Sequence, residues 1–271
     1  MFAPIDSLVD SIRSSAKYRH ISPDLVRRIG SAELLKRPSL KQAIKSTKSK
    51  LHQVGAAYVA GRTPYDRWRE ALGAAHKEGP GQLQAMCRQI MLAHVSSRER
   101  VPIIERFYKD VFGRIGSVNS IIDLACGLNP LALPWMGLPK DVAYRALDIY
   151  ADLSGFLNDT FAILGVAGQA SVQDVLSPTA GLDADLTLLL KALPCLQQID
   201  RGATLELVDR ITSPWLVISY PARSIGGRGK GMVETYRADF LALAERKEWE
   251  AKELLYDTEL VYVVHQTKHC N

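Results

Sequence analysis

Apolar positions in the first 110 residues recur every three or four residues, which predicts amphipathic helices. The stretch PIDSLVDSIR carries its apolar side chains at positions 5, 8, 9 and 12. Ser22-Pro23 can supply the N-cap and first residue of a second helix, and Ser39 can cap a third. Ser96 and Glu99 have the spacing of a capping box, so another helix is expected to begin there; Pro102 would strain it one turn later.

Beyond about residue 115 the pattern changes to short β-rich apolar runs, most of them separated by segments that can form helices. The runs occupy residues 120–127, 143–150, 170–176, 184–193 and 213–222. This alternation predicts a mostly parallel sheet covered by helices. The last run, ELLYDTELVYVVHQ (253–266), predicts two more strands that turn near Asp257-Thr258. We expect a Rossmann-like α/β domain whose mostly parallel seven-stranded sheet ends in a C-terminal antiparallel hairpin, preceded by a helical N-terminal domain.

Charge is distributed unevenly along the 271 residues. The formal net charge is +5, yet residues 1–110 hold 20 of the 34 Lys and Arg residues and only 10 of the 29 Asp and Glu residues. A basic segment joined to an acidic one favours a polyanionic partner for the first part. The alternative is a basic helical face that is simply solvated.

The four cysteines, Cys87, Cys126, Cys195 and Cys270, are scattered and form no CxxC pair. This usage is typical of a reducing cytoplasm, and it argues against a disulfide framework or a zinc site. No apolar run reaches the roughly 18 residues needed to cross a bilayer. We therefore expect a cytoplasmic protein with no metal site and no membrane association.

Acidic residues end three successive predicted strands, at Asp123, Asp148 and Asp174. The carboxyl ends of parallel strands meet at the sheet edge where ligands bind. The first turn, in IIDLACGLNPLAL (121–133), lacks the GxGxxG pattern of dinucleotide-binding proteins. One acid at a strand end is usually only facing solvent. The ordered set would repel phosphates and tolerate a sulfonium, and a carboxylate after the second strand can accept both ribose hydroxyls. These features favour S-adenosylmethionine as the cofactor.

The segment DLACGLNPLAL (123–133) resembles the first-strand motif of a known family. This is the family of 16S ribosomal RNA guanine-N7 methyltransferases that confer aminoglycoside resistance, the Arm/Rmt group and its relatives in actinomycetes that produce these drugs. Further blocks resemble the same family in the same order: AKYRHISPDLVRRI (16–29), KSKLHQVGAAY (48–58), HVSSRER (94–100), LLLKALPCL (188–196), YPARSIGGRGKGM (220–232) and TELVYVV (258–264). The resemblance spans almost the whole chain.

The resemblance implies a helical, basic domain over residues 1–105 that docks on the 30S subunit. It implies a class I methyltransferase domain over residues 106–271 that binds S-adenosylmethionine. Arg100, close to the domain junction, is expected to pair with the methionine carboxylate, and Asp148 of the second domain to bind the ribose. The full set of expected cofactor residues is His94, Arg100, Asp123, Ala125, Gly127, Asn129, Asp148, Gln173, Asp174, Lys191 and Leu193.

The RNA-binding residues expected from charge and resemblance fall into two groups. Docking on ribosomal RNA phosphates is expected of Lys17, Arg19, Arg27, Arg28, Lys45, Lys48, Lys50, Arg67 and Arg69. Positioning of a flipped target guanine is expected of Arg223, Arg228, Met232 and Thr235. No general base is expected, because guanine N7 carries an in-plane lone pair and no hydrogen. Thr235 stands where the family has Asn, and Gln197-Gln198 where it often has charged residues.

The glycine-rich segment SIGGRGKGM (224–232) invites comparison with a phosphate-binding P-loop. A P-loop needs GxxxxGK[ST] after the first strand, whereas here Gly-Lys is followed by Gly231 and the segment follows the fifth strand. A P-loop NTPase is therefore disfavoured. A glycine-rich surface loop is the plain alternative to a loop that holds the target nucleotide.

The expected reaction is methyl transfer to N7 of a guanine in the aminoacyl decoding site of the 30S subunit, by a monomeric enzyme that binds neither DNA nor membrane. Two alternatives stay open at this point. One keeps the fold and changes the target to another RNA base or a small molecule. The other is a ribosome-binding or assembly factor without catalytic activity.

Overall fold

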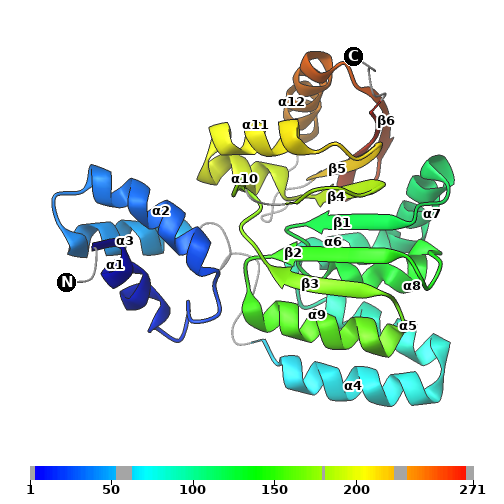
Figure 1. The fold of residues 1–271 in the computed structure, drawn as a ribbon. Helices are drawn as coiled ribbons and strands as arrows, with labels where there is room; N and C mark the ends of the chain where they lie inside the picture. Colours follow the sequence, from blue (N-terminus) through cyan, green and yellow to red (C-terminus); the bar gives the residue numbers. More distant parts are fainter. Residues whose placement is uncertain (1–3, 53–62, 179–180, 223–230, 267–271) are drawn as a thin grey trace.

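The computed structural model describes residues 4–52, 63–178, 181–222 and 231–266 (Figure 1). The helices are α1 (Pro4–Arg13), α2 (Pro23–Lys36), α3 (Leu40–Leu51), α4 (Tyr65–Glu78), α5 (Pro80–Met91), α6 (Val95–Arg100), α7 (Ile104–Ile115), α8 (Leu133–Met136), α9 (Ala151–Leu164), α10 (Leu193–Ile199), α11 (Arg201–Arg210) and α12 (Met232–Lys247). The strands are β1 (Ser120–Leu124), β2 (Ala143–Asp148), β3 (Gly168–Val172), β4 (Leu186–Leu190), β5 (Trp215–Pro221), β6 (Glu250–Leu255) and β7 (Glu259–His265). None of these described helices combines the length and apolar character needed to cross a bilayer.

The strands form one seven-stranded sheet in the order β3-β2-β1-β4-β5-β7-β6. Strands β1 to β5 pair in parallel, and β7 runs antiparallel to both β5 and β6. The predicted mostly parallel sheet and its C-terminal hairpin are confirmed. The hairpin turns between Leu255 and Glu259, where the sequence predicted it.

Helices cover both faces of the sheet, because successive strand residues point to opposite sides. Ile121 of β1 packs in a core with residues of α5, α7 and α9, while its neighbour Ile122 packs in a second core with residues of α10, α11 and α12. The two cores explain why the parallel strands read as continuous apolar runs rather than as alternating ones.

A third hydrophobic core joins α1, α2 and α3, which lie in front of the carboxyl ends of β1, β2 and β3 (Figure 1). Its buried side chains include Leu8, Ile12 and Leu25. Helices α4 and α5 belong instead to the core beneath the sheet, and α4 packs on α9. The domain division at residue 105 stays a prediction, and the cores of the described residues separate α1–α3 from the rest.

Local signals at the helix ends had mixed outcomes. Ser22 and Ser39 cap α2 and α3 as predicted, accepting hydrogen bonds from the backbone N–H groups of Leu25 and Gln42. The predicted capping box at Ser96 is wrong, since α6 begins at Val95 and the backbone oxygen of Ser96 accepts a hydrogen bond from the Lys191 ammonium. Pro102 lies in a 3₁₀ turn between α6 and α7. It therefore does not stand inside an α-helix, where the sequence predicted that it would cause strain.

Gly168 gives a test of this packing. It pairs with Tyr144 in the sheet, and a Cβ there would lie 2.3 Å from the buried Phe161 ring. We expect Gly168→Ala to lower the free energy of unfolding by about 1–3 kcal/mol, because the enclosed ring has little room to shift. Urea unfolding measures this change.

Gly113→Ala is the matched control. Gly113 lies exposed in α7, and a Cβ there would meet nothing within 4 Å. This variant should be neutral or gain up to about 1 kcal/mol from helix propensity. Equal destabilisation by both substitutions would contradict the packing of Phe161 on β3.

Candidate cofactor and RNA-modification site

The expected cofactor residues gather at one edge of the sheet. The strand order reverses between β1 and β4, and in open α/β sheets ligands bind outside the carboxyl ends of the strands at this point. The turn after β1, the end of β2 and the segment after β3 all lie along this edge. Helix α6 reaches it as well, since Arg100 bonds to Asn129 and the His94 ring lies against Gly127.

The turn after β1 has a constrained backbone. Ala125 has φ 53° and Gly127 has φ 51°, both in the left-handed region. A Cβ at Gly127 would lie 3.3 Å from Cε1 of His94, so the position favours glycine by conformation and by space. Strained backbone of this kind is concentrated at functional sites. The turn thereby presents its backbone beside Asp148.

Asp148 is oriented by the backbone. Its Oδ2 accepts a hydrogen bond from the Gly127 N–H at 2.9 Å, and its Oδ1 accepts one from the Ile149 N–H at 2.7 Å. Burial raises the pKa of Asp148, while these N–H donors act in the opposite direction. A carboxylate has about four acceptor positions, so lone pairs are left for two hydroxyl groups of a ligand.

Asp123, near the end of β1, is almost completely buried, with 1% of its surface exposed. Its Oδ2 accepts hydrogen bonds from the Asn129 amide at 2.9 Å and the Tyr144 hydroxyl at 2.7 Å. Among the described residues its Oδ1 has no hydrogen-bond partner, although the atom is buried. Burial raises the pKa of Asp123 to about 6, against the effect of these donors. An acceptor without a partner at the end of β1 fits a ligand that brings a donor.

Arg100 lies at the centre of a buried ion-pair cluster. Its Nε and Nη2 donate to the two carboxylate oxygens of Glu259, at 3.1 and 2.5 Å, and its Nη1 donates to the Asn129 side-chain oxygen at 2.9 Å. The Arg100 side chain is 2% exposed and Glu259 is fully buried. Three of the five guanidinium N–H groups are used, so a methionine carboxylate would share Arg100 with Glu259.

Lys191 joins the same cluster from the end of β4. It has φ 57°, and its Nζ donates to the Glu99 carboxylate at 2.9 Å and the Ser96 carbonyl at 2.7 Å. Its Nζ also lies 3.6 Å from the Glu259 carboxylate. Burial alone would raise the pKa of Glu259, but the cations of Arg100 and Lys191 hold it below its usual value. We call Arg100, Lys191, Glu259 and Glu99 the buried charge cluster.

Sequence reasoning missed two acidic members of this cluster and the tyrosines beside it. Glu259 opens β7, directly before its apolar run LVYVV, and an acid at the start of a strand that is otherwise buried was the available signal. Tyr108 donates to the Asn129 oxygen at 2.5 Å and Tyr144 to Asp123, but neither stands out in the sequence from a core aromatic residue.

The remaining expected cofactor residues lie at the same edge with different exposure. Gln173 follows β3 half-buried, and Asp174 is 4% exposed and bonded to Arg28. Leu193 opens α10, which follows β4, and packs within the second core. Burial, together with the charges of Lys191 and Arg100, lowers the pKa of His94 to about 4, so the ring stays neutral at physiological pH.

Of the expected target-base residues, Met232 and Thr235 lie in the first turn of α12, which follows β5. The Thr235 hydroxyl donates to the Gly231 carbonyl at 2.9 Å. Arg223, Arg228 and most of the glycine-rich segment lie outside the described residues. The roles of these four residues stay predictions.

The expected RNA-docking cations divide by their partners. Arg27 pairs with Asp6, Lys50 with Glu33, and Arg69 with both Asp66 and Asp159. Lys17 contacts the His52 ring, and Arg28 pairs with Asp174. Five of the nine expected docking cations form no ion pair with a carboxylate in the described part of the chain: Lys17, Arg19, Lys45, Lys48 and Arg67.

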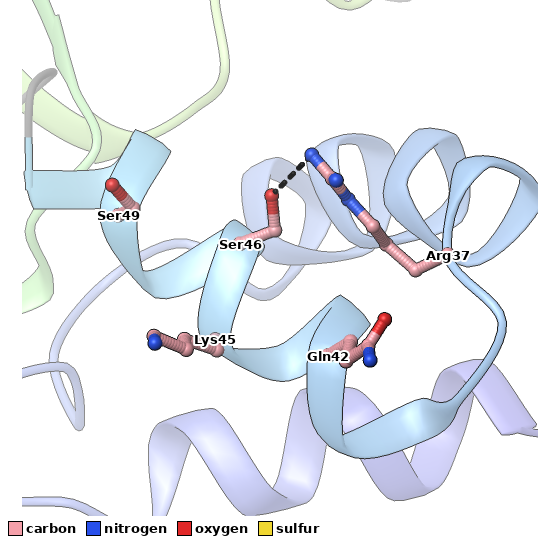
Figure 2. A pocket seen from close by; sticks show the side chains of 5 residues that line it. All are labelled: Arg37, Gln42, Lys45, Ser46 and Ser49. Atoms are coloured by element: carbon pink, nitrogen blue, oxygen red, sulfur yellow. Dashed lines mark hydrogen bonds between the residues drawn. The ribbon is translucent and has the colours of Figure 1, made fainter.

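A hollow of about 290 Å³ lies between the end of α2 and α3, away from the sheet edge (Figure 2). Its lining side chains are Arg37, Gln42, Lys45, Ser46 and Ser49, and Arg37 donates to the Ser46 hydroxyl at 3.2 Å. Of its two cations, Arg37 also pairs with the Glu33 carboxylate at 3.1 Å, whereas Lys45 has no ion pair among the described residues. The hollow is not the cofactor site, since none of the strand-end residues reaches it.

The buried charge cluster gives a stability test. Glu259→Gln keeps the side-chain shape but leaves Arg100 and Lys191 buried without their shared carboxylate. We expect this variant to lose roughly 3–5 kcal/mol of unfolding free energy. Chemical unfolding followed by circular dichroism measures the loss.

Glu253→Gln serves as its control in the same hairpin. Glu253 pairs with Arg237 at 2.7 Å, and both side chains are 34% exposed. A partly exposed pair of this kind contributes far less than a buried one, because solvent screens it. Similar losses in the two variants would show that the cluster has no special role.

Comparison with known proteins gives the family. The model of the ribosomal RNA methyltransferase (FmrO) family matches residues 13–263. The chain is 38% identical over 265 residues to a 16S rRNA (guanine(1405)-N(7))-methyltransferase of Micromonospora rosea, covering 97% of each chain, and 32% identical over 261 residues to one of Serratia marcescens, covering 96% of this chain and 98% of that one.

Solved structures agree with this match. The 16S rRNA methyltransferase RmtF, crystallised with S-adenosyl-L-homocysteine, is 29% identical and superposes with a TM-score of 0.80 over 98% of this chain and all of that chain. The 16S rRNA methylase RmtB is 27% identical, with a TM-score of 0.79 over 97% of this chain and 98% of that chain. The chain therefore belongs to the ribosomal RNA methyltransferase (FmrO) family.

Proposed function

We propose that this protein transfers a methyl group from S-adenosylmethionine to N7 of a guanine in the aminoacyl decoding site of 16S rRNA, within the 30S subunit. The observation that carries the proposal is the family match across residues 13–263, in a chain whose carboxyl sheet edge keeps the oriented carboxylates. The methylated guanine gains a positive charge, which repels polycationic aminoglycosides and gives resistance. We further propose a cytoplasmic enzyme that acts as a monomer.

The residues at the sheet edge fit the cofactor. S-adenosylmethionine supplies an activated methyl group on its sulfonium. Asp148, held by two backbone N–H groups, keeps lone pairs for the ribose hydroxyls. The Oδ1 atom of Asp123, which has no partner among the described residues, suits a donor of the methionine part, and Arg100 keeps two N–H groups for its carboxylate.

The acceptor chemistry explains why no general base is needed. Guanine N7 attacks through its own lone pair and loses no proton. The protein must therefore place N7 in line with the methyl–sulfur bond, which is a task of orientation. Extrusion of the base from its helix would give N7 this access, and Met232 and Thr235 at the start of α12 are proposed to help hold it.

RNA docking is proposed for the basic helices of residues 1–105. The cations without ion pairs, together with the hollow of Figure 2, are the places we assign to phosphates. Lys45 belongs to both groups. Phosphate contacts of this kind give affinity and salt dependence but little sequence preference.

Methyl transfer to purified 30S subunits tests the proposal, with naked 16S rRNA as the comparison substrate. We expect labelled methyl groups to appear in 30S subunits at one decoding-site guanine, detected by borohydride and aniline cleavage at N7-methylguanine. Asp148→Ala should lose this activity because it removes the ribose contact. In a sensitive bacterium, expression should give resistance to gentamicin- and kanamycin-type drugs but not to apramycin.

Other outcomes identify the alternatives. Methylation of a different base, or of naked RNA alone, would overturn the target. Cofactor binding without transfer to either RNA would favour a ribosome-binding factor without catalytic activity.

A further inference from the structure

An ion pair connects the helices proposed for RNA docking to the carboxyl edge of the sheet where the cofactor is proposed to bind, here called the cofactor edge. Arg28 lies on α2, and Asp174 follows β3, 146 positions later in the chain. The Nε and Nη2 atoms of Arg28 donate to Oδ2 and Oδ1 of Asp174, at 2.6 and 3.3 Å. The Asp174 side chain is 4% exposed, and that of Arg28 is 27% exposed. A two-pronged pair of this kind fixes the plane of the carboxylate.

The acceptor positions of Asp174 are almost filled. Its Oδ1 accepts from Arg28 and also from the Leu176 N–H at 3.1 Å, whereas its Oδ2 accepts from Arg28 alone among the described residues. Each carboxylate oxygen can accept about two hydrogen bonds. One position on Oδ2 is therefore left for a ligand donor, and Arg28 determines where it points. The exocyclic amino group of adenine is a donor of the required kind.

The segment that leads into α2 is tied to the edge at a second place. The Ser22 N–H donates to the Ile149 carbonyl at 2.7 Å, and the Ala151 N–H donates to the His20 carbonyl at 2.7 Å. Ile21 and Tyr150 form an antiparallel bridge between these contacts. Ile149 directly follows the ribose carboxylate Asp148. The residues before α2 thus contact the segment after β2, and Arg28 of α2 contacts the segment after β3.

The neighbouring Arg27 behaves differently. It pairs with Asp6 of α1 at 2.8 Å, and both side chains are well exposed, at 49% and 38%. One step along a helix turns the side chain by about 100°. Two adjacent arginines thus serve different partners, one within α1–α3 and the other across to the sheet.

We propose that Arg28 is a positioning residue for the cofactor, which holds the Asp174 carboxylate toward the adenine amino group and joins α2 to the cofactor edge. This role replaces the phosphate contact expected for Arg28 from its charge, and it rests on the proposed S-adenosylmethionine function. Without the guanidinium, a nearly buried carboxylate loses its cation and its fixed orientation.

Calorimetric titration with S-adenosylhomocysteine and S-inosylhomocysteine tests this role, because the inosine analogue has an oxygen in place of the adenine amino group. The wild type should prefer S-adenosylhomocysteine by about tenfold or more, as a site built for a donor rejects a ligand that lacks it. Arg28→Ala should bind S-adenosylhomocysteine about tenfold more weakly and lose most of the preference, since a broken buried pair typically costs more than 1.4 kcal/mol. Arg28→Lys should recover part of both.

Arg27→Ala is the matched control and should keep the affinity and the preference of the wild type. In an Asp174→Ala background, Arg28→Ala should cause no further loss if it acts through that carboxylate. Unchanged S-adenosylhomocysteine affinity in Arg28→Ala, or additive losses in the double variant, would overturn the proposal. A general loss of folding would lower the affinity for both ligands equally and would also count against it.

The two proposals fail in different ways. If the wild type binds S-adenosylhomocysteine but leaves 30S subunits unmethylated, the proposed function fails while the titrations still decide the role of Arg28. If 30S subunits are methylated and Arg28→Ala keeps its ligand preference, only the role of Arg28 fails.

Discussion

The contact between Arg100 and Glu259 is the constraint on which the cofactor edge depends. It brings α6, from the helical part of the chain, onto the last strand of the sheet, 159 positions later. Through Asn129 the same guanidinium reaches the turn after β1, and through Glu259 it reaches Lys191 at the end of β4. A buried guanidinium needs all of these partners, because unpaired charge is costly in the interior. The four elements are thereby held in one arrangement.

Around this cluster, the edge holds three carboxylates that differ in their burial and in their hydrogen-bond and charge partners. Glu259 is ionised beside two cations, Asp148 is held by backbone N–H groups, and Asp123 is buried with a raised pKa. These differences assign different tasks to the acids: Glu259 supports the structure, while Asp148 and Asp123 keep acceptors for a ligand. The edge therefore suits a cationic sulfonium cofactor better than a phosphorylated one. Helix α2 also contacts this edge, because its Arg28 forms an ion pair with Asp174.

Much of this arrangement could be predicted from the sequence, because the signals were local or periodic. The strand runs, the caps at Ser22 and Ser39 and the hairpin near Asp257 follow from short-range patterns. The cluster could not be predicted, since no local pattern says that an acid in β7 meets an arginine in α6. The same limit applies to Arg28, whose charge indicated a phosphate partner while its position in the fold gives it Asp174. Which charged residues pair over long distances in the chain depends on the tertiary structure, and local patterns in a single sequence do not show it.

We propose that the carboxyl edge of β1 to β3, together with the start of α2, binds the cofactor. Hydrogen exchange measured with and without S-adenosylhomocysteine tests it most directly. The account predicts slower exchange at residues 124–129, 148–151 and 173–176 and in the first turns of α2, with the outer strand β6 unchanged. Protection confined to the hollow between α2 and α3, or to the β6–β7 hairpin, would contradict it.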